Sequence, residues 1–409
     1  MSTPRWVDVA RAANLLGADG RPRATIFAEM SALAAATGAV NLGQGFPDVD
    51  GPESVARVAA ESIARGVNQY PPSPGIPELR HAVAAHQSRH YGIELDPDTQ
   101  VLVTAGATEA MAATVLALAG PGDEVLTLEP FYDAYAAVIA LSGATHTTAP
   151  LRATPDGFRL DEQALAAAFT SRTRLVVINT PHNPTGAVLT RAELELVGRL
   201  AREHDALVVT DEVYEHLTLA GPDGTRPRHV PMASLPGMAD RTLTISSAGK
   251  TFSFTGWKIG WLSGPADLVD AVRTVKQFLT YVNGAPFQPA VAFALADEGV
   301  AVWVDELAAS LARRRDLLSD GLRTAGFTVA PADGTYFVLA DAAPLGYDDG
   351  AALCRDLPRL CGVVGVPVSA FTRPGSQADE ALRSWVRFTF VKREDVLAEA
   401  VRRLRTLGT

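Results

Sequence analysis

The sequence is poor in lysine. Only four of its 36 basic residues are lysines, which leaves 32 arginines. An arginine stays protonated in proteins, whereas a lysine can lose its proton and attack a carbonyl group. Chemistry that needs an amine side chain is therefore restricted to Lys250, Lys258, Lys276 and Lys392.

Other absences narrow the class of protein. Two cysteines, Cys354 and Cys361, cannot build a disulfide framework or a four-thiolate metal site. The apolar runs are too short to span a bilayer, and the first residues lack the apolar core of a signal peptide. A formal charge of −10 argues against a nucleic-acid partner or an acidic membrane, which would need a clustered basic surface. We therefore expect a cytoplasmic protein with no nucleic-acid and no membrane partner.

The 409 residues alternate between apolar runs and helical patterns. Strands are predicted at 101–106, 124–130, 174–181, 206–212 and 242–247. Helices are predicted at 53–65, 78–91, 107–119, 132–142 and 191–204. Short apolar strands separated by helices are typical of a parallel sheet that is covered on both faces. A long amphipathic helix after about residue 302, followed by strand-like runs at 334–341 and 385–392, indicates a second, smaller α+β domain.

Candidate reactive residues follow several of these strands. They are Gly106 to Thr108, Asn179 to Asn183, Asp211, and Ser247 to Lys250. In open α/β sheets, ligands bind beyond the carboxyl ends of the strands, so these segments are expected to meet in one site. The first segment also opens a helix, whose free N–H groups suit a phosphate, and Ser247 and Lys258 could add a hydroxyl and a charge.

Lys250 is the candidate amine of this site. It follows an apolar strand within a turn of small residues, where burial would lower its pKa and make it a nucleophile. The alternative is an ordinary surface lysine. A phosphate loop is a weaker interpretation, because Thr244 stands where that loop needs glycine. The spacing Ser247-x-x-Lys250 also matches penicillin-recognising acyl enzymes, but no S-D-N motif follows it.

Asp211 ends a strand and allows three roles: metal ligand, helix cap, or partner of a protonated heterocycle nitrogen. Tyr214 could turn its hydroxyl into the same site. His86 and His90 have helical spacing, but we expect them to face solvent on an alanine-containing helix. The sequence therefore predicts no metal site.

Six motifs together resemble the class I/II aminotransferases, the fold-type I pyridoxal-phosphate enzymes, over nearly the whole chain from about Thr25. In order they are GATEA, EPFYDAY, NTPHNPTG, VVTDEVYEHL, SSAGKTFSFTGWKIGW and VRFTF. The stretches VNLGQGFPD and NQYPP are similar to the kynurenine, glutamine and methionine aminotransferase branch. Within it, YPPSPG and NGAPFQPAVA most resemble actinobacterial N-succinyldiaminopimelate aminotransferases.

The resemblance implies a role for each matching residue. Lys250 would attach pyridoxal 5'-phosphate and move the substrate proton, and Asp211 would pair with the pyridine nitrogen. Arg387 would bind the substrate α-carboxylate as a planar fork. Asn183 and Tyr214 would hydrogen-bond the phenolate oxygen of the cofactor, and Tyr132 would stack on its ring. Ala107, Thr108, Ser247 and Lys258 would hold the phosphate. Gly45 and Phe27 would line the substrate side of the site, and Asn183 would also contact the substrate.

The resemblance also implies an assembly and a fold. Tyr70 would reach the phosphate of the neighbouring subunit, so that the active unit would be a homodimer. The expected fold is α/β, with a large domain over 51–301 that holds a mostly parallel seven-stranded sheet and a small α+β domain made of 25–50 and 302–409. Residues 1–24 are polar and show little periodicity, so we expect a mobile or wrapping N-terminal arm, and the part before Arg23 has no counterpart in the family. The implied reaction transfers an amino group from an amino acid to a 2-oxo acid, with 2-oxoglutarate and glutamate as the expected pair.

Simpler interpretations remain open for four of these residues. Arg387 could be a salt-bridge residue on a strand face, because it lies in an alternating strand. Tyr132 could pack in the core, Tyr70 could belong to a turn before Pro71, and Ser247 could cap a turn.

Overall fold

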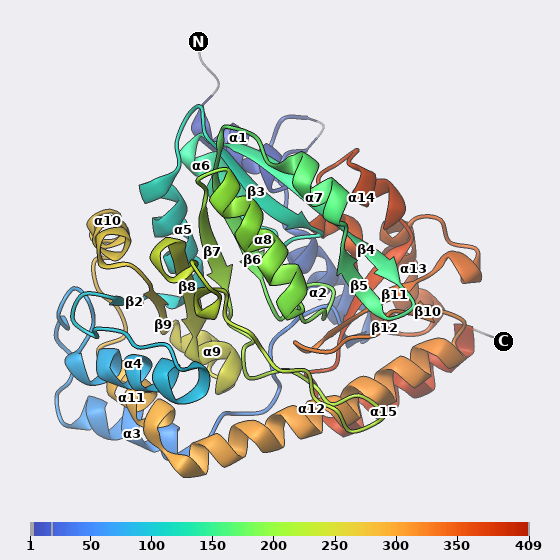
Figure 1. Cartoon of the computed structure of the whole chain (residues 1–409). Coiled ribbons are helices and arrows are strands. Elements are labelled where there is room, and N and C mark those ends of the chain that lie inside the picture. The colour runs from blue at the N-terminus through green and yellow to red at the C-terminus, as the bar shows by residue number, and fades with distance from the viewer. Residues whose placement is uncertain (1–3, 18, 408–409) are drawn as a thin grey trace.

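The computed structural model describes residues 4–17 and 19–407, and its larger sheet has eight strands in the order β2-β9-β8-β7-β6-β3-β4-β5 (Figure 1). Neighbours from β8 to β4 are parallel, whereas β9 is antiparallel to β2 and β8, and β5 is antiparallel to β4. The strands are β2 (Val101–Thr104), β3 (Glu124–Glu129), β4 (Thr145–Thr154), β5 (Gly157–Leu160), β6 (Thr173–Asn179), β7 (Leu207–Asp211), β8 (Thr242–Ser247) and β9 (Gly260–Ser263).

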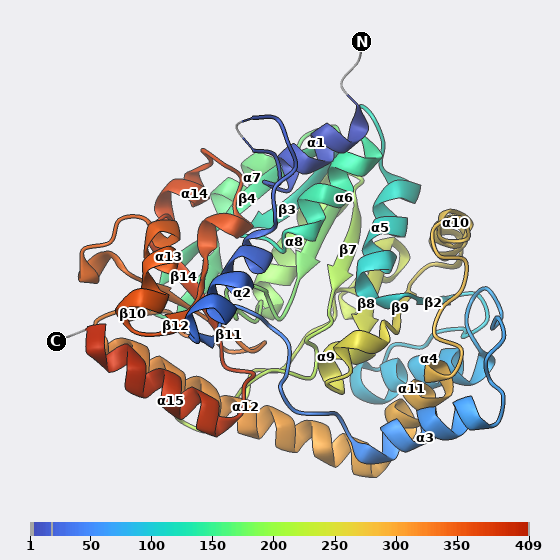
Figure 2. The ribbon, with the colours of Figure 1, turned by 180° about the vertical axis from the view of Figure 1, so that it is seen from behind.

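Helices cover both faces of this sheet. Along β6, Val176 packs against α8 (Arg191–Glu203), while Val177 packs on the opposite side with α5 (Gly106–Leu118) and α6 (Ala134–Ser142). Figure 1 shows α8 in front of the sheet, and Figure 2 shows α5 and α6 in front of it after the half turn. Successive side chains of a strand point to opposite faces, so a strand buried on both sides is apolar throughout, as predicted.

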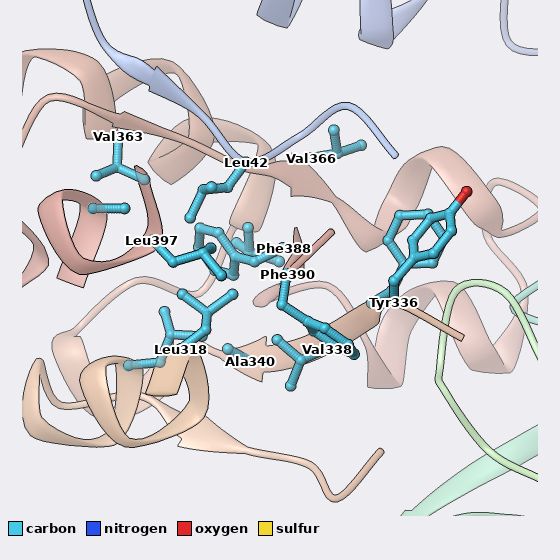
Figure 3. Packing of buried hydrophobic residues seen from close by; sticks show 14 of the residues in the cluster. Leu42, Leu318, Tyr336, Val338, Ala340, Val363, Val366, Phe388, Phe390 and Leu397 are labelled. Carbon is cyan, nitrogen blue, oxygen red and sulfur yellow. The ribbon is translucent and has the colours of Figure 1, made fainter. Parts of the chain in front are cut away.

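A smaller antiparallel sheet forms the second core, in the order β10-β11-β14-β13. Its strands are β10 (Thr328–Val329), β11 (Phe337–Asp341), β13 (Val366–Pro367) and β14 (Trp385–Thr389), with a parallel pair, β1 (Val40–Asn41) and β12 (Val363–Val364), nearby. Figure 3 shows Val338 and Phe388 of this sheet packing with Leu318 of α12 (Glu298–Thr324) and Leu397 of α15 (Glu394–Leu404).

The remaining helices surround these two cores. Helices α3, α4 and α11 pack together beside the β2 edge of the large sheet (Figures 1 and 2). The bounds are α1 (Arg5–Ala12), α2 (Ile26–Thr37), α3 (Glu53–Ala64), α4 (Pro77–Tyr91), α7 (Glu162–Ala168), α9 (Ala248–Thr251), α10 (Ala266–Lys276), α11 (Phe287–Ala296), α13 (Gly350–Leu360) and α14 (Gln377–Ala381). Six short 3-10 segments lie at Met232–Ser234, Ala239–Arg241, Thr255–Trp257, Ala343–Leu345, Val368–Phe371 and Arg405–Leu407.

All five predicted strands and five predicted helices of the first 260 residues are confirmed. The sheet has one strand more than the expected seven, because β5 folds back on β4 as a short antiparallel extension. Strand β4 was not predicted because its sequence contains no apolar run. Most of its residues are at least partly exposed in the structure. The N-terminal segment, which was expected to be an irregular arm, contains α1, whose Ala10 is buried where the helix packs against α6. The domain boundaries stay a prediction.

One sequence expectation about α4 is wrong. His86 was placed in solvent, but its side chain is only 3% exposed. The ring packs against His216 of the segment that follows β7 and against Tyr91, so a distant part of the chain covers this helix face. Helical spacing alone could not reveal that contact.

Across residues 4–17 and 19–407, no single helix has the length and apolar character that a membrane crossing requires. One bent pair, α11 with α12, passes the same test on length and composition alone.

The contact between β9 and the turn before α5 can be tested by adding one methyl group. A Cβ on Gly260 would lie 2.7 Å from the carbonyl carbon of Gly106 and 2.8 Å from the nitrogen of Ala107. Gly260→Ala should therefore push this turn away and cost about 1–3 kcal/mol in the free energy of unfolding, measured by denaturant titration. Gly256→Ala is the matched control, because its Cβ meets no atom within 4 Å. Equal stability of the two variants would contradict this packing.

Candidate active site

A cavity of about 330 Å³ lies where the carboxyl ends of β6, β7 and β8 meet the start of α5. Its size is within the range of small-molecule sites. Twelve of the thirteen predicted site residues line it: Phe27, Gly45, Ala107, Thr108, Tyr132, Asn183, Asp211, Tyr214, Ser247, Lys250, Lys258 and Arg387. The sequence prediction that these separate segments meet in one place is therefore confirmed, whereas their individual roles stay predictions.

Two lysines reach this cavity from one short stretch of chain. Lys250 lies on α9 directly after β8, and its amine is 5.9 Å from the ring centroids of both Tyr214 and Tyr336. Lys258 has a left-handed backbone with φ 55°, an uncommon conformation for a side chain other than glycine. Burial, and then the positive charge of Lys250, lower the pKa of Lys258. The two amines thus share one partly desolvated space.

Asp211 is buried at the end of β7 and is held by hydrogen bonds. Its Oδ2 accepts a 2.6 Å bond from the hydroxyl of Tyr135, and its Oδ1 accepts a 3.4 Å bond from the backbone N–H of Val213. Burial raises the pKa of the Asp211 carboxyl, and these two bonds and the charge of Lys250 act in the opposite direction. A cation or N–H donor that entered the cavity beside it would stabilise the ionised form.

Arg387 extends from β14 into the cavity, and one of its three guanidinium nitrogens has no partner. Its Nη1 donates to Asn183 Oδ1 at 3.0 Å, and its Nη2 donates to the carbonyl of Gly43 at 3.0 Å. Its buried Nε has no hydrogen-bond partner among the described residues. Burial lowers the pKa of Arg387 to about 10, so the guanidinium remains charged at neutral pH. A buried cation with a free N–H is suited to an incoming carboxylate.

Aromatic rings enclose this guanidinium. Its central carbon lies 4.0 Å from the ring centroid of Phe337, 4.6 Å from that of Phe371 and 5.4 Å from that of Phe27. Cation–π contacts of this kind hold an arginine in place while leaving its N–H groups free.

Tyr70 lies outside the cavity, unlike the other predicted site residues. It borders a separate open depression with Pro71 and Asn283, and its side chain is 82% exposed. Its ring makes an edge contact with Tyr281 at a centroid distance of 5.6 Å. Within the described part of the single chain, nothing brings this hydroxyl to the cavity.

The simpler interpretations can now be compared with the geometry. The Ser247 side chain makes no capping bond to α9, and Arg387 forms no ion pair with any described carboxylate. Thr244 lies within β8, so the segment that resembled a phosphate loop is a strand there. Lys250 lines the cavity and is not an ordinary surface lysine.

Sequence reasoning missed two supporting residues, Tyr135 and Tyr336, and named Asn179 without assigning it a role. Tyr135 bonds Asp211, and Asn179 donates to the Asp211 carbonyl at 2.8 Å while accepting from the N–H of Asn183 at 2.7 Å. The hydroxyl of Tyr336 donates to the carbonyl of Gly45 at 2.7 Å. The motif EPFYDAY carried a signal for Tyr135, because Tyr132 and Tyr135 lie three residues apart at the start of a predicted helix and so share a face.

With this geometry established, comparison with known proteins identifies the family. A model of the class I and II aminotransferases matches residues 37–404. The chain belongs to this family. The probable N-succinyldiaminopimelate aminotransferase of Mycobacterium tuberculosis is 55% identical, over 95% of this chain and 97% of its own length. The methionine aminotransferase of Escherichia coli is 39% identical over 94% and 96% of the two chains, and rat kynurenine–oxoglutarate transaminase 3 is 35% identical over 93% and 87%.

Solved structures agree with this assignment. N-succinyldiaminopimelate aminotransferase from Mycobacterium tuberculosis superposes with a TM-score of 0.89 at 54% identity, covering 94% of this chain and 97% of that one. Aspartate aminotransferase from Thermus thermophilus gives a TM-score of 0.84 at 31% identity, with 94% and 97% covered. The predicted fold type I and the predicted transaminase activity are thereby confirmed.

The aminotransferases of this class depend on pyridoxal 5'-phosphate, and the donor set of the cavity fits that cofactor. Asp211 offers a buried carboxylate and Lys250 an amine within the same space. Gly106, with φ 76°, opens α5 so closely to Lys258 that a Cβ there would lie 3.2 Å from the lysine Nζ. A helix start facing an ammonium group is suited to a phosphate. The cavity therefore has an anionic group, a nucleophile and an anion-binding corner.

The hydrogen bond from Tyr135 can be removed without changing the ring. Tyr135→Phe should raise the pKa of Asp211 further, because the bond helps to keep that carboxyl ionised. A hydrogen bond to a charged group contributes about 1.5–3 kcal/mol, so we expect kcat of the transaminase to fall about tenfold to a hundredfold with little change in KM. Tyr347→Phe, a partly buried tyrosine that does not line the cavity, is the control. An unchanged kcat would show that the Asp211 carboxylate does not depend on this bond.

Proposed function

We propose that this aminotransferase exchanges the amino group of N-succinyl-LL-2,6-diaminopimelate with 2-oxoglutarate, or runs the reverse reaction with glutamate, in lysine biosynthesis. The observation that carries the proposal is the 55% identity to the mycobacterial enzyme over nearly the full length of both chains. Identity falls to 39% and 35% for the methionine and kynurenine enzymes. The reaction is balanced: the donor leaves as a 2-oxo acid, and the acceptor takes up the amine.

The roles of the ionisable residues follow from their positions. When bound, pyridoxal 5'-phosphate supplies an electron sink that stabilises negative charge at the substrate α-carbon. Lys250 would hold the cofactor through its Nζ, and the same amine would serve as the base and acid that moves the proton of the substrate α-carbon. Asp211 would keep the pyridine nitrogen protonated, and the bond from Tyr135, which favours the ionised carboxylate, supports this role.

Other residues orient the two bound molecules. Arg387 grips the α-carboxylate, for which its unpartnered Nε provides a donor. Asn183 and Tyr214 hydrogen-bond the phenolate oxygen, and Tyr132 stacks on the ring. The start of α5, at Ala107 and Thr108, holds the phosphate together with Ser247 and Lys258, while Gly45 and Phe27 line the substrate side; all of these residues border the same cavity.

We also propose that the enzyme is a cytoplasmic homodimer whose active sites lie at the subunit interface. Tyr70 and Phe278 are 82% and 84% exposed, and Leu279 and Tyr281 of the same region are each 44% exposed. Large exposed apolar side chains that gather in one region are typical of protein–protein contacts. In the dimer, Tyr70 reaches the phosphate bound by the other subunit.

A second candidate is a broad aminotransferase for kynurenine, methionine and glutamine, with cysteine-conjugate β-lyase side activity. The identities of 39% and 35% to methionine and kynurenine enzymes favour this candidate over unrelated activities.

An amino-donor panel with 2-oxoglutarate distinguishes the two candidates. We expect kcat/KM for N-succinyl-LL-2,6-diaminopimelate to exceed that for kynurenine or methionine by about tenfold or more, equivalent to about 1.4 kcal/mol of additional transition-state stabilisation. Lys250→Ala is the matched control, and its turnover should be lower by about 10²–10⁴-fold because the proton-moving amine is gone. Weak activity on the succinylated donor beside strong activity on kynurenine or methionine would favour the broad enzyme.

The shared active site can be tested with Tyr70→Phe, which removes only a hydroxyl. If that hydroxyl binds the phosphate of the other subunit, the variant should stay dimeric by light scattering but release pyridoxal 5'-phosphate about tenfold more readily in dialysis. Tyr281→Phe, in edge contact with Tyr70, serves as the control. A monomeric wild type, or equal cofactor retention in the two variants, would contradict the proposed arrangement.

A further inference from the structure

Three of the eight histidines of the chain converge outside the cavity. His86 and His90 lie one turn apart on α4, and His216 lies in the turn that follows β7. The Nε2 atoms of His86 and His216 are 2.7 Å apart, and one potential ligand atom from each of the three rings lies within 4.8 Å of the other two. The ring centroids are separated by 4.6 to 5.0 Å. None of the three lines the cavity that contains Lys250.

The close approach of His86 and His216 bears on their protonation. Their Nε2 atoms are 2.7 Å apart, so one ring donates an N–H to the lone pair of the other, and at least one of the two rings is neutral. A neutral imidazole is the form that binds a divalent cation.

A buried carboxylate lies beside the cluster. This carboxylate belongs to Glu215, which directly precedes His216 in the chain and is buried. Its Oε1 accepts from Ser246 at 2.6 Å, whereas its buried Oε2 has no hydrogen-bond partner among the described residues. The cluster thus has a negative charge next to it and an unsatisfied polar atom, both of which a cation would stabilise.

The neighbouring cations are paired with other groups. Arg89 donates to the carbonyl of Leu295 at 2.6 Å, and Arg226 donates to Asp305 at 3.0 Å and to the carbonyl of His216 at 2.7 Å. Asp305 also lies close enough to His90 to act on its pKa. The other ionisable neighbours are Glu212 and His229, which are bonded to each other at 2.8 Å, and Tyr91, whose ring contacts those of His86 and His90 and whose hydroxyl is close enough to Glu215 to interact with it.

We propose that His86, His90 and His216 form a binding site for a first-row transition-metal dication such as Zn²⁺. Two histidines at i and i+4 on a helix, joined by a third from another element, provide the nitrogen ligands that such ions prefer. A tetrahedral site with Zn–N distances near 2.0–2.1 Å needs nitrogens roughly 3.4 Å apart. Metal binding would therefore require side-chain rotations that move the Nε2 atoms of His86 and His216 apart from 2.7 Å and bring the His90 ring closer to both. His90 is exposed, so it provides the entry path and leaves the fourth position to water.

The bound ion would hold in place a segment next to the active site. His216 is two residues from Tyr214 and five from Asp211, so the ion would join α4 to the turn that follows β7 and carries Tyr214. An ion that binds only the folded chain stabilises it in proportion to RT ln(1 + [ion]/Kd). The role is one of positioning, since the three histidines do not touch the cavity.

The site can be tested with Co²⁺, whose visible bands report nitrogen coordination. Untagged, chelator-treated holoenzyme is titrated with Co²⁺, and Zn²⁺ is then added in competition. We expect one Co²⁺ per chain, displaced by Zn²⁺, and a rise in the melting temperature of the wild type when either ion is added. His90→Asn should weaken binding by about tenfold or more and abolish the rise in melting temperature.

His81→Asn is the matched control, because His81 is exposed on the same helix and bonds the carbonyl of Pro77, away from the cluster. It should bind Co²⁺ like the wild type. Wild-type holoenzyme without Co²⁺ bands in a large molar excess of the ion would overturn the proposal. The same conclusion follows if His90→Asn keeps the bands unchanged, because the ion would then be bound elsewhere, for example at a phosphate.

Discussion

The active-site geometry depends on keeping one carboxylate buried and ionised at the same time. Asp211 ends a strand inside the large sheet, where burial opposes its charge. Tyr135, the Val213 N–H and the positive charge of Lys250 compensate for that opposition. Each compensating group comes from a different element, so the order of strands and helices around β7 is part of the chemistry. A residue of this kind cannot work on an isolated strand.

The guanidinium of Arg387 is likewise both buried and charged, but its charge is positive. It is buried, and the oxygens of Asn183 and Gly43 satisfy only two of its three nitrogens. The small sheet supplies this arginine, while the large sheet supplies Asp211 and the segment after β8 supplies Lys250. The cavity therefore exists only where the two sheets meet, and packing of the kind shown in Figure 3 fixes the position of β14 within the small sheet.

Much of this arrangement could be predicted from the sequence, because the parallel strands are apolar throughout and their carboxyl ends carry the polar residues. Lysine scarcity directed attention to Lys250, and the motifs around it supplied the family. Two of the elements that escaped prediction have mixed patterns: β4 is partly exposed, and α1 is a short amphipathic helix that packs against α6. Tyr135 was missed because its partner lies 76 residues away.

The histidines of α4 also show what a sequence pattern cannot predict. Helical spacing correctly put His86 and His90 on one face, but it could not indicate that the turn after β7 covers that face. A local pattern determines which residues share a surface. What lies against that surface depends on chain order and sheet topology, which the spacing does not contain.

Helix α6 is held at both ends. Its first turn carries Tyr135, whose hydroxyl holds Asp211, and near its last turn the carbonyl of Leu141 accepts a 2.8 Å bond from Arg5. The helix thus connects the N-terminal segment with the buried carboxylate of Asp211 through these two contacts. A sequence change in that segment can shift α6 and so alter the hydrogen bond from Tyr135 to Asp211, although the segment itself lies outside the active site.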